Sequence, residues 1–125
     1  MGTFIKLTIK YYIRTLYTMW IKGYNKRDKH GLKHGHWVTY HYDGTVLEIG
    51  SYNHGKKVGY WESNYNNGLM YSKGYYDEGF MVGNWEYYDS SRKYLARGKY
   101  KDSKRDGYWE EYVNRGKTYY QYFYL

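Results

Sequence analysis

Residues 59–82 read GYWESNYNNGLMYSKGYYDEGFMV, and the same arrangement of aromatic residues and glycines recurs along the chain. Four Gly-x-Trp triplets begin at residues 35, 59, 83 and 107, so each starts 24 residues after the one before it. Two further sets keep this period: Gly50, Gly74 and Gly98, and Tyr52, Tyr76, Tyr100 and Tyr124. This regularity predicts a tandem array of 24-residue units.

Each unit carries the signature of a β-hairpin. The dipeptides Asp43-Gly44 and Asn67-Gly68 are typical of two-residue type I′ turns. A turn at these positions predicts one column that opposes apolar to apolar and acid to base or amide: Val38 with Ile49, Glu62 with Lys73, Glu86 with Arg97, and Glu110 with Gln121. It predicts a second column on the same face: Tyr40 with Leu47, Asn64 with Tyr71, Tyr88 with Leu95, and Tyr112 with Tyr119.

The opposite face is expected to lay each tryptophan across a glycine of the paired strand, which has no Cβ to obstruct the ring. The register sets Trp37 over Gly50, Trp61 over Gly74, and Trp85 over Gly98. On this basis Gly74→Val is expected to clash with Trp61 and to destabilise the fold.

His54-Gly55 and Glu78-Gly79 are expected to be the turns that join one hairpin to the next. The fold class is therefore all-β, a tandem β-hairpin meander that forms an elongated, twisted, mostly single-layer antiparallel sheet. Residues 1–34 are interpreted as a basic N-terminal arm with a degenerate capping hairpin, and residues 35–125 as four repeats: 35–58, 59–82, 83–106 and 107–125. For residues 1–18, alternating polarity favours a strand, whereas basic residues spaced by four fit a helix.

The Gly-x-Trp-x-x-Tyr pattern with its following glycine and tyrosine columns resembles the MORN repeat (membrane occupation and recognition nexus) from Trp20 to Tyr124. The chain departs from the pattern at Asn64, Arg92 and Ser103. The resemblance implies a hairpin meander used for binding. MORN proteins are described as scaffolds, dimerisers and phospholipid binders, and bacterial proteins with this variant are often described as antitoxin components. The resemblance implies no catalytic residue and no cofactor.

The amino-acid composition excludes several classes of protein and of functional site. The 125 residues include 22 Tyr and 5 Trp but no Cys, which excludes a disulfide framework, a thiolate metal site and a cysteine nucleophile. Lysines and arginines interrupt the only apolar region near the N-terminus, so neither a transmembrane helix nor a secretory signal is expected. We therefore expect an intracellular protein, cytoplasmic or peripheral to a membrane.

Candidate chemistry is sparse. The five histidines are interpreted as exposed turn residues rather than metal ligands: His30, His34, His36, His41 and His54. Glu62, Glu86 and Glu110 lie two strands apart and are interpreted as structural pairing partners, not as an acid-base pair. We therefore expect no enzyme activity, no metal and no cofactor.

Three kinds of partner are expected. Aromatic residues exposed on a rigid sheet favour another protein: Trp37, Trp61, Trp85, Trp109, Tyr52, Tyr76 and Tyr100. Residues 1–34 hold eight Lys or Arg against one acid, which favours an anionic membrane surface over a nucleic acid: Lys6, Lys10, Arg14, Lys22, Lys26, Arg27, Lys29 and Lys33. A homo-oligomer through the terminal strands is the third.

Overall fold

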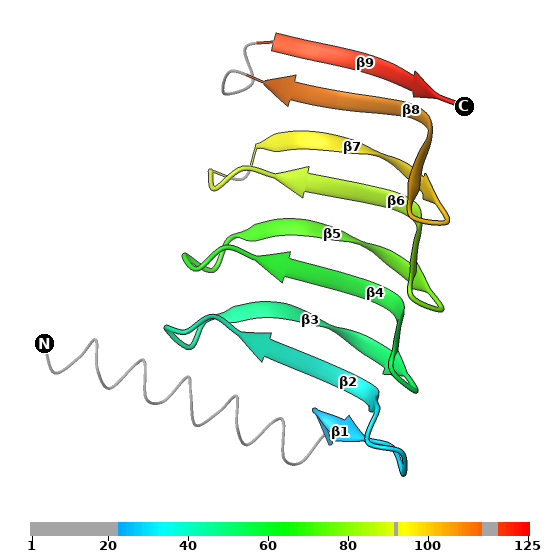
Figure 1. Cartoon of the computed structure of the whole chain (residues 1–125). Helices are drawn as coiled ribbons and strands as arrows, with labels where there is room; N and C mark the ends of the chain where they lie inside the picture. Colours follow the sequence, from blue (N-terminus) through cyan, green and yellow to red (C-terminus); the bar gives the residue numbers. More distant parts are fainter. Residues whose placement is uncertain (1–22, 92, 114–117) are drawn as a thin grey trace, which may run out of the picture.

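The computed structural model describes residues 23–91, 93–113 and 118–125, which form one open antiparallel sheet of nine strands (Figure 1). Every strand pairs with its neighbours in sequence. The strands are β1 Lys26–Arg27, β2 Lys33–Tyr40, β3 Val46–Asn53, β4 Lys56–Asn64, β5 Met70–Asp77, β6 Phe80–Tyr88, β7 Tyr94–Lys101, β8 Lys104–Val113 and β9 Thr118–Tyr124. The predicted all-β hairpin meander is confirmed; the strand-or-helix question for residues 1–18 lies outside the described residues.

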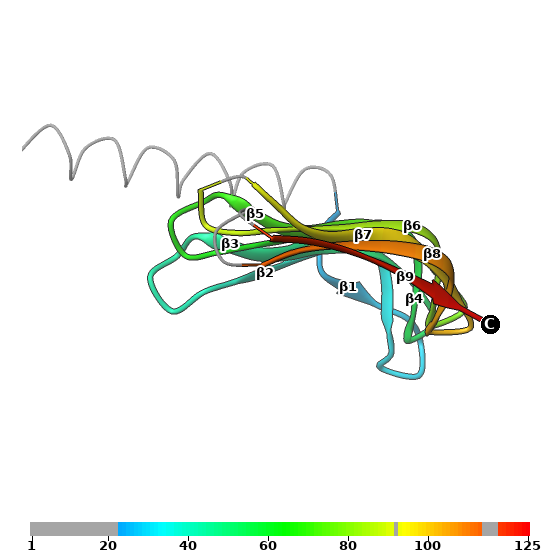
Figure 2. The ribbon, with the colours of Figure 1, turned by 90° about the horizontal axis from the view of Figure 1, so that it is seen from above.

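The sheet is a single layer that bends near the turns joining one hairpin to the next (Figure 2). The first glycine of each Gly-x-Trp triplet lies in this region with a positive φ, 70° at Gly59 and 66° at Gly83. The β3–β4 register shifts between Ile49, opposite Glu62, and Ser51, opposite Val58, so β4 has two more residues than β3 over this step. Extra residues bend a strand, and glycine adopts the left-handed conformation without strain. The sequence spacing of these triplets therefore repeats one bend along the whole sheet.

The predicted first column is confirmed, because Glu86 faces Arg97 and the other three pairs match. The second column is wrong in its first three members and right in its last, Tyr112 with Tyr119. The structure pairs Tyr40 with Val46, Asn64 with Met70, and Tyr88 with Tyr94.

The cause is the turn at the hairpin tip. Gly44 N–H donates to the His41 carbonyl at 3.0 Å, and His41 N–H donates to the Thr45 carbonyl at 2.8 Å. Of Asp43 and Gly44, only Gly44 has a positive φ, 89°. This is a three-residue loop built on a type I turn with a glycine bulge, not the predicted two-residue type I′ turn. The loop shifts by one only the pair next to it, Tyr40 with Val46, and an irregularity between Thr39 and Tyr40 restores the predicted pairing from Thr39 with Glu48 onward.

Type I′ geometry occurs instead at the connections between hairpins. His54 and Gly55 both have positive φ values, 44° and 88°, as the type requires. Gly55 N–H donates to the carbonyl of Lys33, and Gly79 N–H donates to that of Lys57, so each of these turns bonds to the start of the strand that follows the preceding turn. The prediction of turns at His54-Gly55 and Glu78-Gly79 is confirmed.

The predicted pairing of Trp37 with Gly50, Trp61 with Gly74 and Trp85 with Gly98 is also confirmed, but the rings that cover these glycines are not those predicted. A Cβ added at Gly74 would lie 2.0 Å from Cδ2 of Trp85, in the next hairpin, rather than against Trp61. The same holds for Gly50 under Trp61 and Gly98 under Trp109. The expected clash of Gly74→Val with Trp61 is therefore wrong, because the ring leans across the boundary between two hairpins.

In the part of the chain that the structure describes, no helix has the length and apolar character needed to span a bilayer.

Candidate interaction surfaces

We call the face that carries the four repeat tryptophans the indole face. On it, tryptophan and tyrosine rings alternate along the sheet. Tyr76 meets Trp61 at 6.0 Å and 77° and Trp85 at 5.3 Å and 89°, both edge-to-face. Tyr52 and Tyr100 occupy the same position between their own neighbouring tryptophans. This edge-to-face geometry is the one aromatic pairs prefer, so the stack stabilises each boundary between hairpins.

Each indole N–H also donates to a backbone carbonyl of the preceding hairpin. Trp85 Nε1 donates to the Tyr75 carbonyl at 3.1 Å, and Trp109 Nε1 to the Lys99 carbonyl at 2.8 Å. Each acceptor follows the glycine beneath the ring by one residue. The bare backbone thus lets the ring lie flat and brings its polar nitrogen to an acceptor, which satisfies the buried donor.

Cations cover the rings at the residues that precede the Gly-x-Trp triplets. Lys57 Nζ lies 4.2 Å from the Trp61 ring, and the Arg105 guanidinium lies 4.2 Å from the Trp109 ring. Lys33 lies over Trp37, and Met81 takes this place beside Trp85. Such contacts are attractive because the ring face is electron-rich. They also shield the indole face from solvent.

The indole face therefore buries most of the aromatic residues predicted to bind a partner. Trp37, Trp61, Trp85 and Trp109 are 8%, 4%, 4% and 0% exposed, so the expectation that these rings are exposed is wrong. Tyr52, Tyr76 and Tyr100 are half-buried, and burial raises the pKa of Tyr76 above its ordinary value. These residues hold one hairpin against the next.

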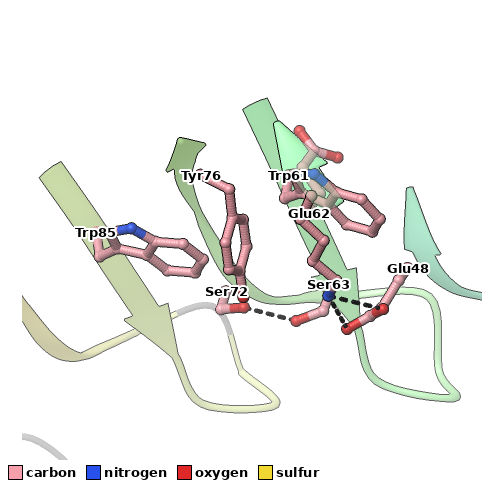
Figure 3. Close-up of a pocket in the computed structure, with 8 residues that line it drawn as sticks. Glu48, Trp61, Glu62, Ser63, Ser72, Tyr76 and Trp85 are labelled. Carbon is pink, nitrogen blue, oxygen red and sulfur yellow. Dashed lines mark hydrogen bonds and ion pairs between the residues drawn. The ribbon is translucent and has the colours of Figure 1, made fainter. Parts of the chain in front are cut away.

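A hollow on this face is too small for a ligand. It lies among Trp61, Tyr76 and Trp85, and the Ser63 and Ser72 hydroxyls bond to each other at 2.6 Å on its floor (Figure 3). Its volume of about 30 Å³ matches one water molecule. The indole face thus offers no site for an organic molecule in this hollow.

We call the opposite face the ladder face, after the alternating charges Glu62, Lys73, Glu86, Arg97 and Glu110, whose neighbours face each other across successive strands. Lys73 Nζ lies 3.2 Å from Glu86, and Arg97 Nε lies 2.5 Å from Glu110. The sequence placed the partners of Glu86 and Glu110 within their own hairpins, whereas these ion pairs join consecutive hairpins. Glu86 also accepts from the Tyr88 hydroxyl. These carboxylates are bound as structural partners.

Two pairs of exposed aromatic rings lie beside this ladder, each two residues along the strands from it and both toward the turns that join the hairpins. Tyr60 and Tyr75 lie 5.5 Å apart, and Tyr108 and Phe123 lie 4.8 Å apart. Tyr75 is 50% exposed and Tyr108 is 67% exposed. The signal for them was present in the sequence, because a residue next to a buried tryptophan in a strand points to the opposite face. Sequence reasoning overlooked them by treating the tryptophans themselves as the contact residues.

Shallow hollows lie between these rings and the charges. One, of about 400 Å³, is lined by Tyr60, Tyr75, Lys73, Asn84 and Glu86. Another, of about 260 Å³, adjoins it across Asn84 and Glu86 and reaches Arg97, Tyr108 and Glu110. The ladder face therefore combines aromatic ridges with charged depressions, a relief suited to a protein surface rather than to an enclosed small molecule.

The basic residues of the predicted anionic-surface site are only partly described. Lys6, Lys10, Arg14 and Lys22 lie outside the described residues. Lys26 and Lys29 are exposed. Arg27 donates to the Gly31 carbonyl and lies 5.2 Å from the Trp37 ring, which Lys33 also covers. Of the four cations that the structure describes, Arg27 and Lys33 are thus engaged with the sheet itself.

Two histidines form a small polar cluster with Asp28. His54 Nδ1 lies 2.6 Å from Asp28 Oδ2, and the His54 ring stacks on that of His34 at 4.2 Å. The hydrogen bond from His54 is the largest cause that lowers the pKa of Asp28 to about 2, assisted by the backbone N–H groups of Leu32 and His30. His36 bonds to Ser51 and His41 to the Asn64 carbonyl.

Among the residues that the structure describes, no group of three metal-ligating side chains converges. Comparisons with models of protein families, with curated proteins and with solved structures found no match for this chain.

Proposed function

We propose that the protein is a non-catalytic MORN-type repeat protein that binds another protein through its ladder face. The observation that carries the proposal is the pair of exposed aromatic ridges, Tyr60 with Tyr75 and Tyr108 with Phe123, which lie on the same side of the charge ladder and are separated by β6 and β7. Tyrosine is enriched in binding hot spots because its ring provides a large contact at small entropic cost.

The rigidity of the sheet supports this role. Tyr60, Tyr75 and Tyr108 are carried by strands that are paired on both sides, and Phe123 lies on β9, which pairs with β8. The rings on the indole face connect consecutive hairpins. A surface that is ordered before binding loses less conformational entropy on association. The partner best suited to this relief is a folded protein whose apolar side chains cover the ridges and whose charges complement Lys73, Glu86 and Arg97.

Photo-crosslinking in the source cells tests the proposal. A photoreactive amino acid at position 75, on the ladder face, is expected to capture one defined protein. The same amino acid at Tyr42 is the matched control, because Tyr42 is a tyrosine that is 98% exposed at a hairpin tip. Equal capture at both positions, or capture unaffected by Tyr60→Ser, would contradict the proposal.

The resemblance to bacterial antitoxin components gives the proposal a finer form, in which the bound protein is a toxin. Co-expression with the product of a neighbouring gene is then expected to rescue growth. Rescue should be lost in a variant that combines Tyr60→Ser and Tyr75→Ser but retained in Tyr42→Ser, because only the first changes the ladder face.

A second candidate is peripheral binding to anionic phospholipid, favoured by the concentration of eight basic residues in residues 1–34. Each basic residue near an anionic surface contributes about 1 kcal/mol. Sedimentation with anionic vesicles at low salt should fall sharply when Lys6, Lys10, Arg14 and Lys22 become Glu. Charge reversal at four exposed lysines elsewhere is the control: Lys56, Lys93, Lys101 and Lys104. An equal loss in both variants would show that only net charge matters.

A further inference from the structure

The two edges of the open sheet are built differently. At the β1 edge, the strand has two residues, Lys26 and Arg27, both charged. Beside it, the Asn25 side chain donates to the Val38 carbonyl at 3.0 Å and accepts from the Val38 N–H at 2.7 Å. The amide thus takes the place of a strand neighbour for β2. Short, charged edge strands protect a sheet from pairing with another chain.

The β9 edge has none of these protections. β9 contains seven residues, TYYQYFY, without a charged side chain, and the chain has no proline. Among the described residues, β8 is the only strand that pairs with it. Along Figure 1, β9 closes the stack at the end opposite β1. A long, uncharged, exposed edge strand is a template for main-chain pairing.

The regularity of the last ladder adds to this. β8 and β9 pair without a shift from Gly107 opposite Tyr124 to Val113 opposite Thr118. The preceding ladders, from β2–β3 to β7–β8, each contain a bulge or irregularity. Bulges disrupt pairing and turn an edge away, so β9 is the strand of this sheet best able to accept a further strand.

A strand that pairs with the outer edge of β9 cannot repeat the contact that joins the inner hairpins. In the inner hairpins, the strand that receives the following hairpin carries a glycine under the incoming indole, as at Gly74 and Gly98. The corresponding position of β9 is Tyr122, which faces Trp109 within its hairpin and packs on Tyr120 at 6.1 Å. A head-to-tail addition that repeats the Trp-on-Gly contact is therefore blocked.

We propose that the β9 edge binds the β9 edge of a second copy of this chain, antiparallel and centred on Gln121. This register sets Gln121 opposite itself, Tyr120 opposite Tyr122, and Tyr119 opposite Phe123. Aromatic residues meet aromatic residues on both faces, and no charge is placed in the contact. Cross-strand aromatic pairs stabilise a sheet beyond its main-chain hydrogen bonds.

This geometry is an isologous two-fold contact, because the same residues meet in both directions. The axis is perpendicular to the sheet, so the two ladder faces lie on the same side and form one continuous surface. The paired edge includes Phe123 of the second aromatic ridge, but the ridge at Tyr60 and Tyr75 lies in another part of the molecule, so the dimer does not rest on the proposed function.

Cysteine scanning tests the register directly, because the chain has no cysteine of its own. In the full chain, Gln121→Cys is expected to form a disulfide-linked dimer on mild oxidation. Tyr119→Cys alone is the matched control. Its two sulfurs would be about 14 Å apart along the strands, beyond the reach of a disulfide. Tyr119→Cys mixed with Phe123→Cys should again cross-link. Equal cross-linking of all single variants, or none at position 121, would overturn the proposal.

Sedimentation velocity measures the same contact without a covalent bond. The unmodified protein is expected to dimerise over about 1–100 µM, the range of small interfaces. Gln121→Lys and Gln121→Glu should each be monomeric, since like charges meet on the axis, while their equimolar mixture should restore a dimer. Tyr42→Lys should leave the dimer intact, and circular dichroism would verify that each variant is folded. A monomeric parent protein, or a dimer that persists in Gln121→Lys, would refute the model.

Discussion

Gly74 and Gly83 lie nine residues apart in neighbouring strands and are required for different physical reasons. Gly74 has ordinary strand geometry, but a Cβ there would lie 2.0 Å from the Trp85 ring. Gly83 has open space around it and a φ of 66°, which side chains disfavour. The first glycine makes room for a ring of the next hairpin, and the second permits the bend of the strand.

Substitutions at these two positions should separate the two reasons. Gly74→Ala is expected to destabilise the protein by about 3 kcal/mol, because overpacking displaces a buried ring. Gly83→Ala is expected to cost about 1–2 kcal/mol of backbone strain. Gly83→Asn should recover part of that loss, since asparagine tolerates positive φ. Chemical denaturation of the three variants measures the free energies of unfolding.

A second substitution identifies the ring involved at Gly74. In a Trp85→Leu background, Gly74→Ala should cost much less than in the parent, because the clashing ring is gone. In a Trp61→Leu background its cost should remain nearly unchanged. The opposite ranking would show that the indole covers the glycine of its own hairpin.

At the scale of elements, the contacts that join consecutive hairpins vary in chemistry while keeping their place. Beside Trp109, Arg105 covers the ring, donates to Tyr124 Oη at 3.1 Å and pairs with Glu111. Beside Trp85, the corresponding positions hold Met81 and Tyr87, and the Tyr87 hydroxyl bonds to that of Tyr100 at 3.1 Å. An apolar pair with one hydroxyl bond thus replaces a charged pair at the same location.

Replacing the charged pair by the apolar pair should preserve stability only if residues 105 and 111 both change. Arg105→Met alone is expected to destabilise the protein by about 1–3 kcal/mol, because it leaves the Glu111 carboxylate without its partner. Combining it with Glu111→Tyr should restore most of this loss. Thermal and chemical denaturation measure it, and additive losses in the double variant would argue against the equivalence of the two sites.

The Asp28–His54 contact joins the β1–β2 turn to the β3–β4 turn and should make stability depend on pH. Asp28 has a pKa of about 2 in the fold, below its ordinary 3.8. Its ionised form therefore stabilises the fold above about pH 4, and this contribution is lost as the pH falls from 4 to 2. His54→Asn removes the largest cause of the shift. The Asp28 carboxyl titration, followed by NMR, should then move upward, and the loss of stability in this window should shrink.

The successes and errors of the sequence prediction have physical causes. The register of Glu86 with Arg97 followed from the repeat period and the hairpin turn, both local in sequence. The tip loop was predicted wrongly because Asp43-Gly44 suits both a two-residue turn and a three-residue loop. The backbone angles distinguish the two, since only Gly44 has a positive φ. The glycine under each indole was assigned wrongly because a 24-residue period is the same whether the ring covers the glycine of its own hairpin or that of the preceding hairpin.

At the scale of the whole molecule, the exposed ridges and the β9 edge both follow from the linear arrangement of the described strands. Each strand contacts its sequence neighbours, so the described residues form no central core that every hairpin shares. The described residues instead bury one tryptophan per unit, and the cluster of Trp85, Ala96 and Trp109 spans β6 to β8. In such a linear array, stability is a sum of hairpin and boundary terms. A local change should therefore remain local.

Native-state hydrogen exchange can distinguish this behaviour from that of a globular domain. Gly50→Ala displaces the Trp61 ring from its position over the glycine, since a Cβ there would lie 2.1 Å from the ring. Amides of β3 and β4 should then exchange at least tenfold faster, corresponding to about 1.4 kcal/mol of local stability. Amides of β7 and β8 should change little, because intact hairpin boundaries separate them from the altered boundary.

Gly98→Ala is the matching control at the other end of the sheet, and it should speed exchange in β7 and β8 while leaving β3 and β4 unchanged. A uniform acceleration over all strands would mean that the sheet unfolds as one cooperative unit, and the nearest-neighbour description would then be wrong.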